Sequence, residues 1–154
     1  MSARVRPRVP NIRWLLALIT LLHRWLYRAS RGAIGHRVAI LNWHSLLLTH
    51  TGRKSGRAYT IPLLYLPDGE RFVVVGSNAG DAKPPAWWLN LQSAPEARVQ
   101  VGAHEYAVRA RLAAGEERAR LWTALVANFS DYARYERNLR GTRELPVVVL
   151  ERIG

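Results

Sequence analysis

The chain has 154 residues, of which 49% are apolar, so it is long enough to bury the core of one domain and too apolar for a disordered protein. It contains no cysteine, which excludes disulfides and any thiol-based metal site or catalysis. The net charge of +12 comes from residues 1–67, which hold eleven Lys and Arg and no acid, whereas residues 68–154 hold twelve against eleven acids. A basic half of this kind indicates an anionic partner: a phospholipid surface, a nucleic acid or a phosphorylated small molecule.

The first predicted element is an amphipathic helix over residues 11–31, within a basic N-terminal segment that we assign to residues 1–40. Its continuous apolar run, residues 14–22, is nine residues long, and a bilayer span needs about 20. Two interpretations stay open. The helix packs on the domain, or it lies in a lipid interface with aromatic side chains at headgroup level, namely Trp14, Trp25 and Tyr27. We expect a cytoplasmic protein, which in the second case would be peripheral at the inner face of the cell membrane.

The rest of the chain, residues 41–154, is predicted to form one mainly β domain. Its pattern indicates six strands, at residues 43–50, 58–66, 71–77, 97–101, 105–112 and 146–151. Turn residues at 67–70 and at 102–103 predict that 58–77 and 97–112 are hairpins. Helices are expected at 86–92 and 116–129, with 132–139 either helix or loop. Antiparallel hairpins with few crossovers favour an α+β, mainly β fold, a small antiparallel barrel or sandwich.

The stretch THTGRKSGRAYTIPLLYL, residues 49–66, contains a basic loop between two predicted strands. Its glycines let successive backbone N–H groups converge, and such nests bind anions. Three cations and a hydroxyl group add to that potential: Arg53, Lys54, Arg57 and Ser55. The P-loop spacing GxxxxGK[ST] is absent, so a phosphate-binding loop and a solvated basic turn remain equal alternatives.

Two further segments could line a pocket. The loop GSNAGDAKPPAWWLN, residues 76–90, follows a strand end and offers polar groups together with two tryptophans, which suit either a ring-binding wall or the core. In SDYARYERN, residues 130–138, a helix would place Tyr132 and Tyr135 on one face, where they could shape a pocket, donate a proton or simply pack. The five histidines show no HxxxH or HExxH spacing, so no metal site is expected.

Three segments together resemble the deazaflavin (F420)-dependent nitroreductase family. They are LLLTHTGRKSGRAYTIPLLYL, FVVVGSNAGDAKPPAWWLNLQSAPEARVQVG and ELPVVVLE, and the resemblance covers residues 43–152. It implies a split β-barrel, similar to the FMN-binding split barrels. It also implies coenzyme F420, a deazaflavin that carries a phosphate and a polyglutamate tail, with FMN as the alternative cofactor.

The resemblance also implies site residues. The phosphate and the tail would meet Arg53, Lys54, Ser55, Gly56 and Arg57. The ring would be flanked by Thr60, Pro62, Leu63, Leu64, Ser77, Asn78, Gly80, Lys83, Trp87 and Trp88. The acceptor would lie beside a catalytic set of Ser77, Tyr132 and Tyr135.

The implied activity is hydride transfer from reduced F420 to a quinone or a nitroaromatic compound. Here SDYARYERN departs from the commoner PGYxxYQ, which leaves the acceptor open. A quinone would suit a lipid-facing N-terminal helix, since quinones reside in membranes. The alternatives are a non-catalytic F420 or flavin carrier and, because the pI is 11.3, a nucleic-acid-binding module. The basic residues lack an interleaved aromatic sheet face, so we expect no nucleic-acid partner. The oligomeric state stays open, a homodimer included.

Overall fold

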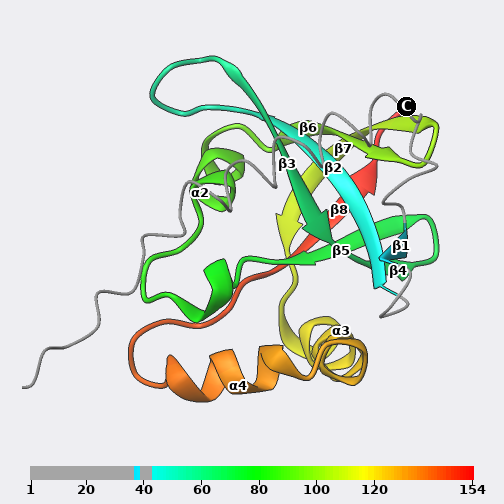
Figure 1. The fold of residues 1–154 in the computed structure, drawn as a ribbon. Helices are drawn as coiled ribbons and strands as arrows, with labels where there is room; N and C mark the ends of the chain where they lie inside the picture. Colours follow the sequence, from blue (N-terminus) through cyan, green and yellow to red (C-terminus); the bar gives the residue numbers. More distant parts are fainter. Residues whose placement is uncertain (1–36, 39–42) are drawn as a thin grey trace, which may run out of the picture.

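The computed structural model describes residues 37–38 and 43–154, which form one eight-stranded antiparallel sheet with three α-helices (Figure 1). The strands are β1 (Arg37–Val38), β2 (Trp43–Thr51), β3 (Ala58–Leu64), β4 (Leu66–Asp68), β5 (Arg71–Val75), β6 (Glu96–Val101), β7 (His104–Leu112) and β8 (Val147–Arg152). The helices are α2 (Ala86–Ser93), α3 (Gly115–Asn128), α4 (Asp131–Asn138) and a short 3-10 turn, η1 (Asn78–Gly80). The predicted helix at 11–31 and the boundary between residues 40 and 41 lie outside the described residues.

The sheet is curled so that its two ends belong to one continuous piece of chain. Neighbouring strands follow the order β3-β2-β6-β7-β8-β5-β4. Only Tyr65 separates β3 at one end of this order from β4 at the other. The Tyr65 side chain is buried, and its N–H donates to the carbonyl of His44 at 3.0 Å. Tyr65 therefore marks the corner at which the chain joins the two ends, and the prediction of a small antiparallel barrel is confirmed.

One predicted pairing is wrong. Residues 58–66 do not pair with 71–77 as a single hairpin, because β3 pairs with β2 over its whole length and only β4 pairs with β5. The apolar run of residues 61–66 passes through Tyr65 without a break, so it cannot reveal that the two halves have different partners. Pro62 and Pro67 lie in strands with only one neighbour each, where a missing N–H is tolerated. The strand β1, which pairs with the start of β2, was not predicted.

Two apolar layers lie on opposite faces of the sheet. In β5 and β8 alternate residues point to the two sides, so Val74 and Val148 belong to the barrel interior and Val73 and Val149 to the outer layer. Burial on both faces explains the unbroken apolar runs of these strands. The outer layer is covered by α3 and α4, while α2 adds its own apolar residues to the barrel interior (Figure 1).

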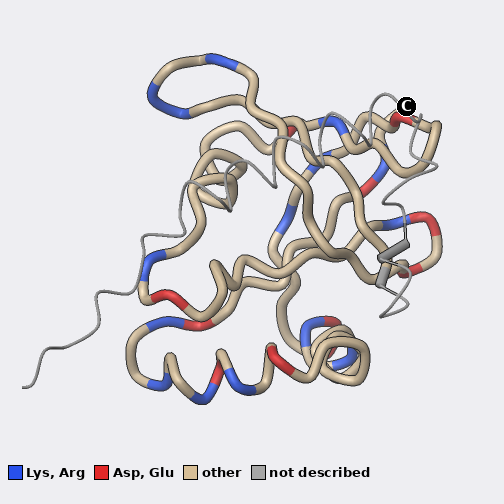
Figure 2. The backbone as a smooth tube through the Cα atoms, in the orientation of Figure 1, with Lys and Arg blue, Asp and Glu red and all other residues tan. Residues whose placement is uncertain are grey.

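The cations gather visibly on the loop between β2 and β3, which projects from the barrel beside α2 (Figure 2). Elsewhere along the described chain Figure 2 shows both basic and acidic segments. A group of ion pairs joins the start of α3 to the sheet, with Glu117 contacting both Arg71 and Arg111. No helix within the described ranges has the length and apolar character needed to cross a membrane.

Candidate functional site

The projecting loop, residues 52–57, is a tight turn that closes on itself. The Gly52 N–H donates to the Arg57 carbonyl, and the Gly56 N–H donates to the Gly52 carbonyl, each at 2.8 Å. A Cβ atom on Gly52 would lie 2.5 Å from Cε2 of Tyr59, so only glycine fits where that ring packs. The Ser55 hydroxyl lies 3.0 Å from the Tyr59 hydroxyl. The loop is therefore held against the first residues of β3. It connects two strands, as predicted.

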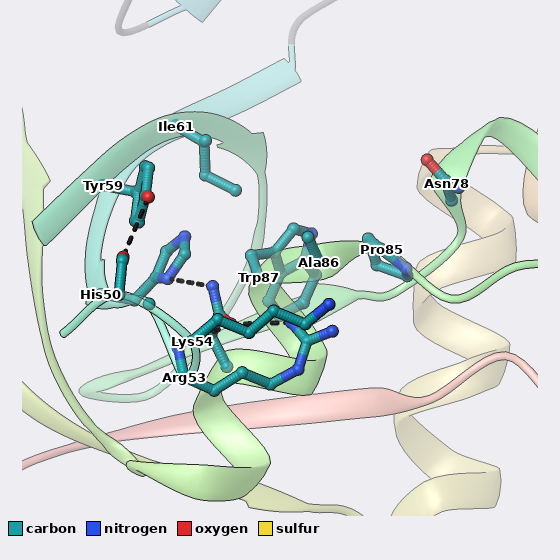
Figure 3. A pocket seen from close by; sticks show the side chains of 12 residues that line it. His50, Arg53, Lys54, Tyr59, Ile61, Asn78, Pro85, Ala86 and Trp87 are labelled. Atoms are coloured by element: carbon teal, nitrogen blue, oxygen red, sulfur yellow. Dashed lines mark hydrogen bonds between the residues drawn. The ribbon is translucent and has the colours of Figure 1, made fainter. Parts of the chain in front are cut away.

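A cavity of about 500 Å³ lies between this loop, β3 and the start of α2 (Figure 3). Its lining comprises His50, Gly52, Arg53, Lys54, Ser55, Tyr59, Ile61, Asn78, Pro85, Ala86, Trp87 and Asn90. The floor is apolar, and two cations reach over one side of it. None of these twelve described residues is an aspartate or a glutamate. The cavity therefore suits a ligand that combines an apolar part with negative charge.

A chain of hydrogen bonds, buried at its His50 end, fixes one of the two cations. The side-chain oxygen of Asn90 accepts from the Arg53 backbone N–H at 3.1 Å and from its Nη1 at 2.9 Å. This orientation turns Nδ2 of Asn90 towards Nδ1 of His50, 3.2 Å away. Nδ1 of His50 is then the acceptor, and the imidazole proton lies on Nε2. Burial lowers the pKa of His50, in keeping with this neutral form.

Sequence reasoning missed His50 and Asn90 as parts of the site. Asn90 could have been found, because it follows Trp87 by three residues and a helix places both on one face. His50 gave no comparable signal. Its role depends on the pairing of β2 with β3 and on the approach of α2, neither of which its neighbours in sequence reveal.

A second cavity, of about 320 Å³, lies on the other side of the loop that follows β5. Its lining comprises Leu64, Ser77, Ala79, Asn128, Phe129, Ser130, Asp131, Tyr132 and Tyr135. The two tyrosines do share one helix, with ring centroids 6.5 Å apart. Gly80 has a φ of +80°, and a Cβ there would lie 2.8 Å from Cδ1 of Tyr135, so this glycine lets the loop pack against the ring. Burial raises the pKa of Tyr132 to about 12, and Tyr135 adds to the shift.

The residues predicted for the site fall into three groups. The first cavity takes in Arg53, Lys54, Ser55, Asn78 and Trp87. The second brings together Leu64, Ser77, Tyr132 and Tyr135. The others line neither cavity: Gly56, Arg57, Thr60, Pro62, Leu63, Gly80, Lys83 and Trp88. Of these, Thr60 is buried with its hydroxyl 2.8 Å from that of Thr49, Lys83 is exposed, and Trp88 faces a different cavity beside Pro84 and Leu89.

The described part of the chain holds no group of three or more His, Asp or Glu side chains placed to bind a metal ion. The site consists of two neighbouring cavities. The first has cations at its edge and no acid among its described lining residues, and the second is lined by two tyrosines. A family model described as F420H(2)-dependent quinone reductase matches residues 20–152. The chain belongs to this family.

Known members and structures agree with the assignment to the F420H(2)-dependent quinone reductase family. An F420H(2)-dependent quinone reductase of Mycobacterium tuberculosis (strain ATCC 25618 / H37Rv) is 37% identical over 134 residues, which cover 85% of this chain and 88% of that protein. A solved structure described as an F420-H2 dependent reductase, FDR-A, has a TM-score of 0.64 and 33% identity, covering 70% of this chain and 93% of the other. Another, described as a domain-swapped dimer, has a TM-score of 0.67 and 28% identity, covering 90% and 97%.

The family assignment confirms the main predictions. The barrel matches an F420-dependent reductase in fold, and the chain is an F420-dependent oxidoreductase by family. The family name specifies quinone reductases, whereas the resemblance found in the sequence was to nitroreductases. The roles of single residues, the acceptor and any membrane contact remain predictions.

Proposed function

We propose that the protein reduces a quinone with a hydride from F420H2, which binds in the cavity beside the 52–57 loop. The carrying observation is the composition of that cavity, whose twelve lining residues include two cations and no acid. F420 combines a flat tricycle with a negatively charged phosphate and glutamate tail. Charge-assisted hydrogen bonds to such groups are the strong ones, and an apolar slot suits the ring.

The residues present fit the coenzyme group by group. Arg53 and Lys54 would hold the phosphate and tail, with Arg53 set in place by Asn90. Ile61, Pro85 and Trp87 offer apolar surface to the ring. When bound, the reduced deazaflavin supplies the hydride. The protein's own contribution is to bind and orient both partners and to keep water out.

The tyrosine cavity is the proposed acceptor site. A quinone that takes up one hydride and one proton becomes a hydroquinone, and negative charge develops on its oxygen before the proton arrives. Tyr132 stays protonated far above neutral pH, because burial raises its pKa to about 12. Its hydroxyl can therefore donate a hydrogen bond to that oxygen throughout the physiological range. Tyr135 packs beside it and would help to position the acceptor.

A turnover assay tests the proposal against the carrier hypothesis. F420H2 is mixed with the protein and menadione, and formation of oxidised coenzyme is followed by absorbance. We expect catalytic oxidation, slowed about 10- to 100-fold in Tyr132→Phe as the donor is lost. Tight binding without oxidation would contradict a reductase and favour a carrier. A nitroimidazole in place of menadione tests the nitroaromatic acceptor that the sequence also suggested.

A further inference from the structure

We propose that Arg143 is a positioning residue that holds the loop between the two cavities, residues 76–83, in its working shape. The inference rests on the proposed function for its consequence in catalysis but not for its structural content. Arg143 belongs to the segment that leads from α4 to β8, far from the loop in sequence. No pattern in the sequence singles it out.

The guanidinium of Arg143 makes four hydrogen bonds to backbone carbonyls of the loop. Its Nη1 donates to Gly76 at 3.0 Å, and its Nη2 donates to Ser77 at 2.8 Å. Asp81 accepts from both Nε at 3.0 Å and Nη2 at 2.8 Å. One side chain thereby satisfies three carbonyl groups on both flanks of the 3-10 turn, so it fixes the distance between the two ends of the loop.

The loop requires such a restraint because its backbone is in an unusual conformation. Asn78, Ala79 and Gly80 have φ values of +47°, +53° and +80°, three left-handed residues in succession. Only the third is a glycine, and residues with a Cβ rarely adopt this conformation without outside support. Four further bonds are internal to the loop. Two join backbone groups, the Gly80 N–H to the Ser77 carbonyl at 2.9 Å and the Asp81 N–H to the Asn78 carbonyl at 3.0 Å. Two involve side chains, Asn78 Nδ2 to the Lys83 carbonyl at 2.9 Å and the Lys83 N–H to Asp81 Oδ1 at 2.7 Å. Internal bonds shape the turn but cannot attach it to the barrel.

The chemistry of arginine suits this role better than that of lysine. Arg143 forms no ion pair with a carboxylate in the described part of the chain, and burial lowers its pKa, yet a guanidinium stays charged at any physiological pH. Its planar fork presents several donors in fixed directions, whereas an ammonium offers one point of charge. The hydrogen bonds to the carbonyl oxygens therefore hold the charged guanidinium of Arg143 in position.

Position explains why the restraint would matter. Asn78 faces the proposed coenzyme cavity, while Ser77 and Ala79 face the tyrosine cavity. A single loop thus contributes to both, and a shift of that loop would change how the two reactants face each other. Misplacement by about 1 Å, even when caused by a distant residue, can cost roughly 100-fold in rate.

Hydrogen exchange tests the restraint without any assumption about activity. We compare Arg143→Lys and Arg143→Ala with the wild type and with Arg140→Ala, which removes an exposed arginine three residues away. Amide exchange at Gly80, Asp81 and Lys83 should accelerate by at least about tenfold in both Arg143 variants. In the wild type, opening of the loop has to break the four hydrogen bonds of Arg143, and in the variants it does not. Exchange in β5 should be the same in the Arg143 variants as in the wild type, and exchange in the loop should be the same in Arg140→Ala as in the wild type. Unchanged loop exchange, or loss of the whole fold in both variants, would overturn the proposal.

Kinetics and chemical rescue test the consequence. In Arg143→Ala the single-turnover oxidation of F420H2 by menadione should slow by about 10- to 100-fold, with a smaller change in coenzyme Kd. Added guanidinium at millimolar concentration should restore part of the rate in Arg143→Ala and none in Arg143→Lys. A wild-type rate in Arg143→Ala would overturn the positioning role. If the wild type itself does not turn over, the proposed function fails, and hydrogen exchange still decides on the restraint.

Discussion

At the scale of single residues, Asn90 connects the helix α2 to the cationic loop. Its amide oxygen accepts two hydrogen bonds from Arg53, and its nitrogen faces His50. All three groups come from different elements, so the amide holds one cation over the cavity before any ligand arrives. Preorganisation of this kind improves binding because less ordering is left to the binding step.

The variant Asn90→Leu, which keeps the branching at Cγ and removes the amide, should lose both stability and affinity. His50 loses its partner in a buried place, where an unsatisfied polar group costs about 1–3 kcal/mol, and the exposed Arg53 loses the acceptor that orients it. Urea unfolding measures the first effect, and coenzyme titration measures the second. Gln92→Leu, at an exposed position of the same helix, should stay within about 0.5 kcal/mol of the wild type. Equal behaviour of the two variants would show that the Asn90 bonds do not organise the loop.

Some residues of the site could be predicted from the sequence, and others could not. Arg53 and Lys54 were recognisable because a cluster of cations among glycines is unusual in a short turn. Tyr132 and Tyr135 were recognisable by their spacing. His50 and Asn90 act through contacts between β2, α2 and the loop, and Arg143 acts on a segment more than 60 positions away. Those contacts are set by tertiary packing, which no local pattern encodes.

At the scale of elements, α3 is docked on the sheet by charge as well as by its apolar face. Glu117 lies in its first turn and accepts from Arg111 at 2.6 and 2.8 Å and from Arg71 at 3.0 Å. The bonds from Arg111, together with the charges of both arginines, lower the pKa of Glu117 to about 2 from 4.5. A carboxylate at a helix N-terminus also suits the helix dipole.

This docking predicts a dependence of stability on pH. Because the folded-state pKa of Glu117 is depressed, its contribution is present above pH 4.5 and is lost as the pH falls towards 2. Glu117→Gln should therefore lower the melting temperature at neutral pH, by about 2–4 °C for each kcal/mol lost, and flatten its fall between those pH values. Glu116→Gln, in the same turn but exposed, serves as the control. Identical pH curves for Glu117→Gln and the wild type would refute a role for this carboxylate in docking α3.

The elements themselves were largely predictable, and their pairing was predictable only in part. Periodicity and turn residues located α2, α3 and the hairpin of β6 with β7 to within a few residues. Residues 58–66 were predicted as one strand, because the apolar run of residues 61–66 passes unbroken through Tyr65. The change of partner there depends on closure of the barrel, which brings β2 to one half and β5 to the other.

At the scale of the whole molecule, the fold places a cationic loop and a pair of tyrosines on opposite sides of one loop. The barrel contributes the rigid frame, α2 closes the first cavity and α4 supplies the second. Four arginines of the described residues form ion pairs around α3, namely Arg71, Arg111, Arg118 and Arg120. Arg53 and Lys54 of the 52–57 loop stand apart from these pairs and line the cavity, which is the basis for assigning them to an anionic coenzyme.

The most direct test is a fluorescence titration of the protein with F420 and with the same deazaflavin lacking the phosphate and glutamate tail. If the cationic loop binds the tail, F420 should bind at least about tenfold more tightly, because charge-assisted hydrogen bonds contribute roughly 1.5–3 kcal/mol each. The difference should shrink as salt is added, since the loop is exposed. Equal affinities for the two compounds at low salt would contradict the account.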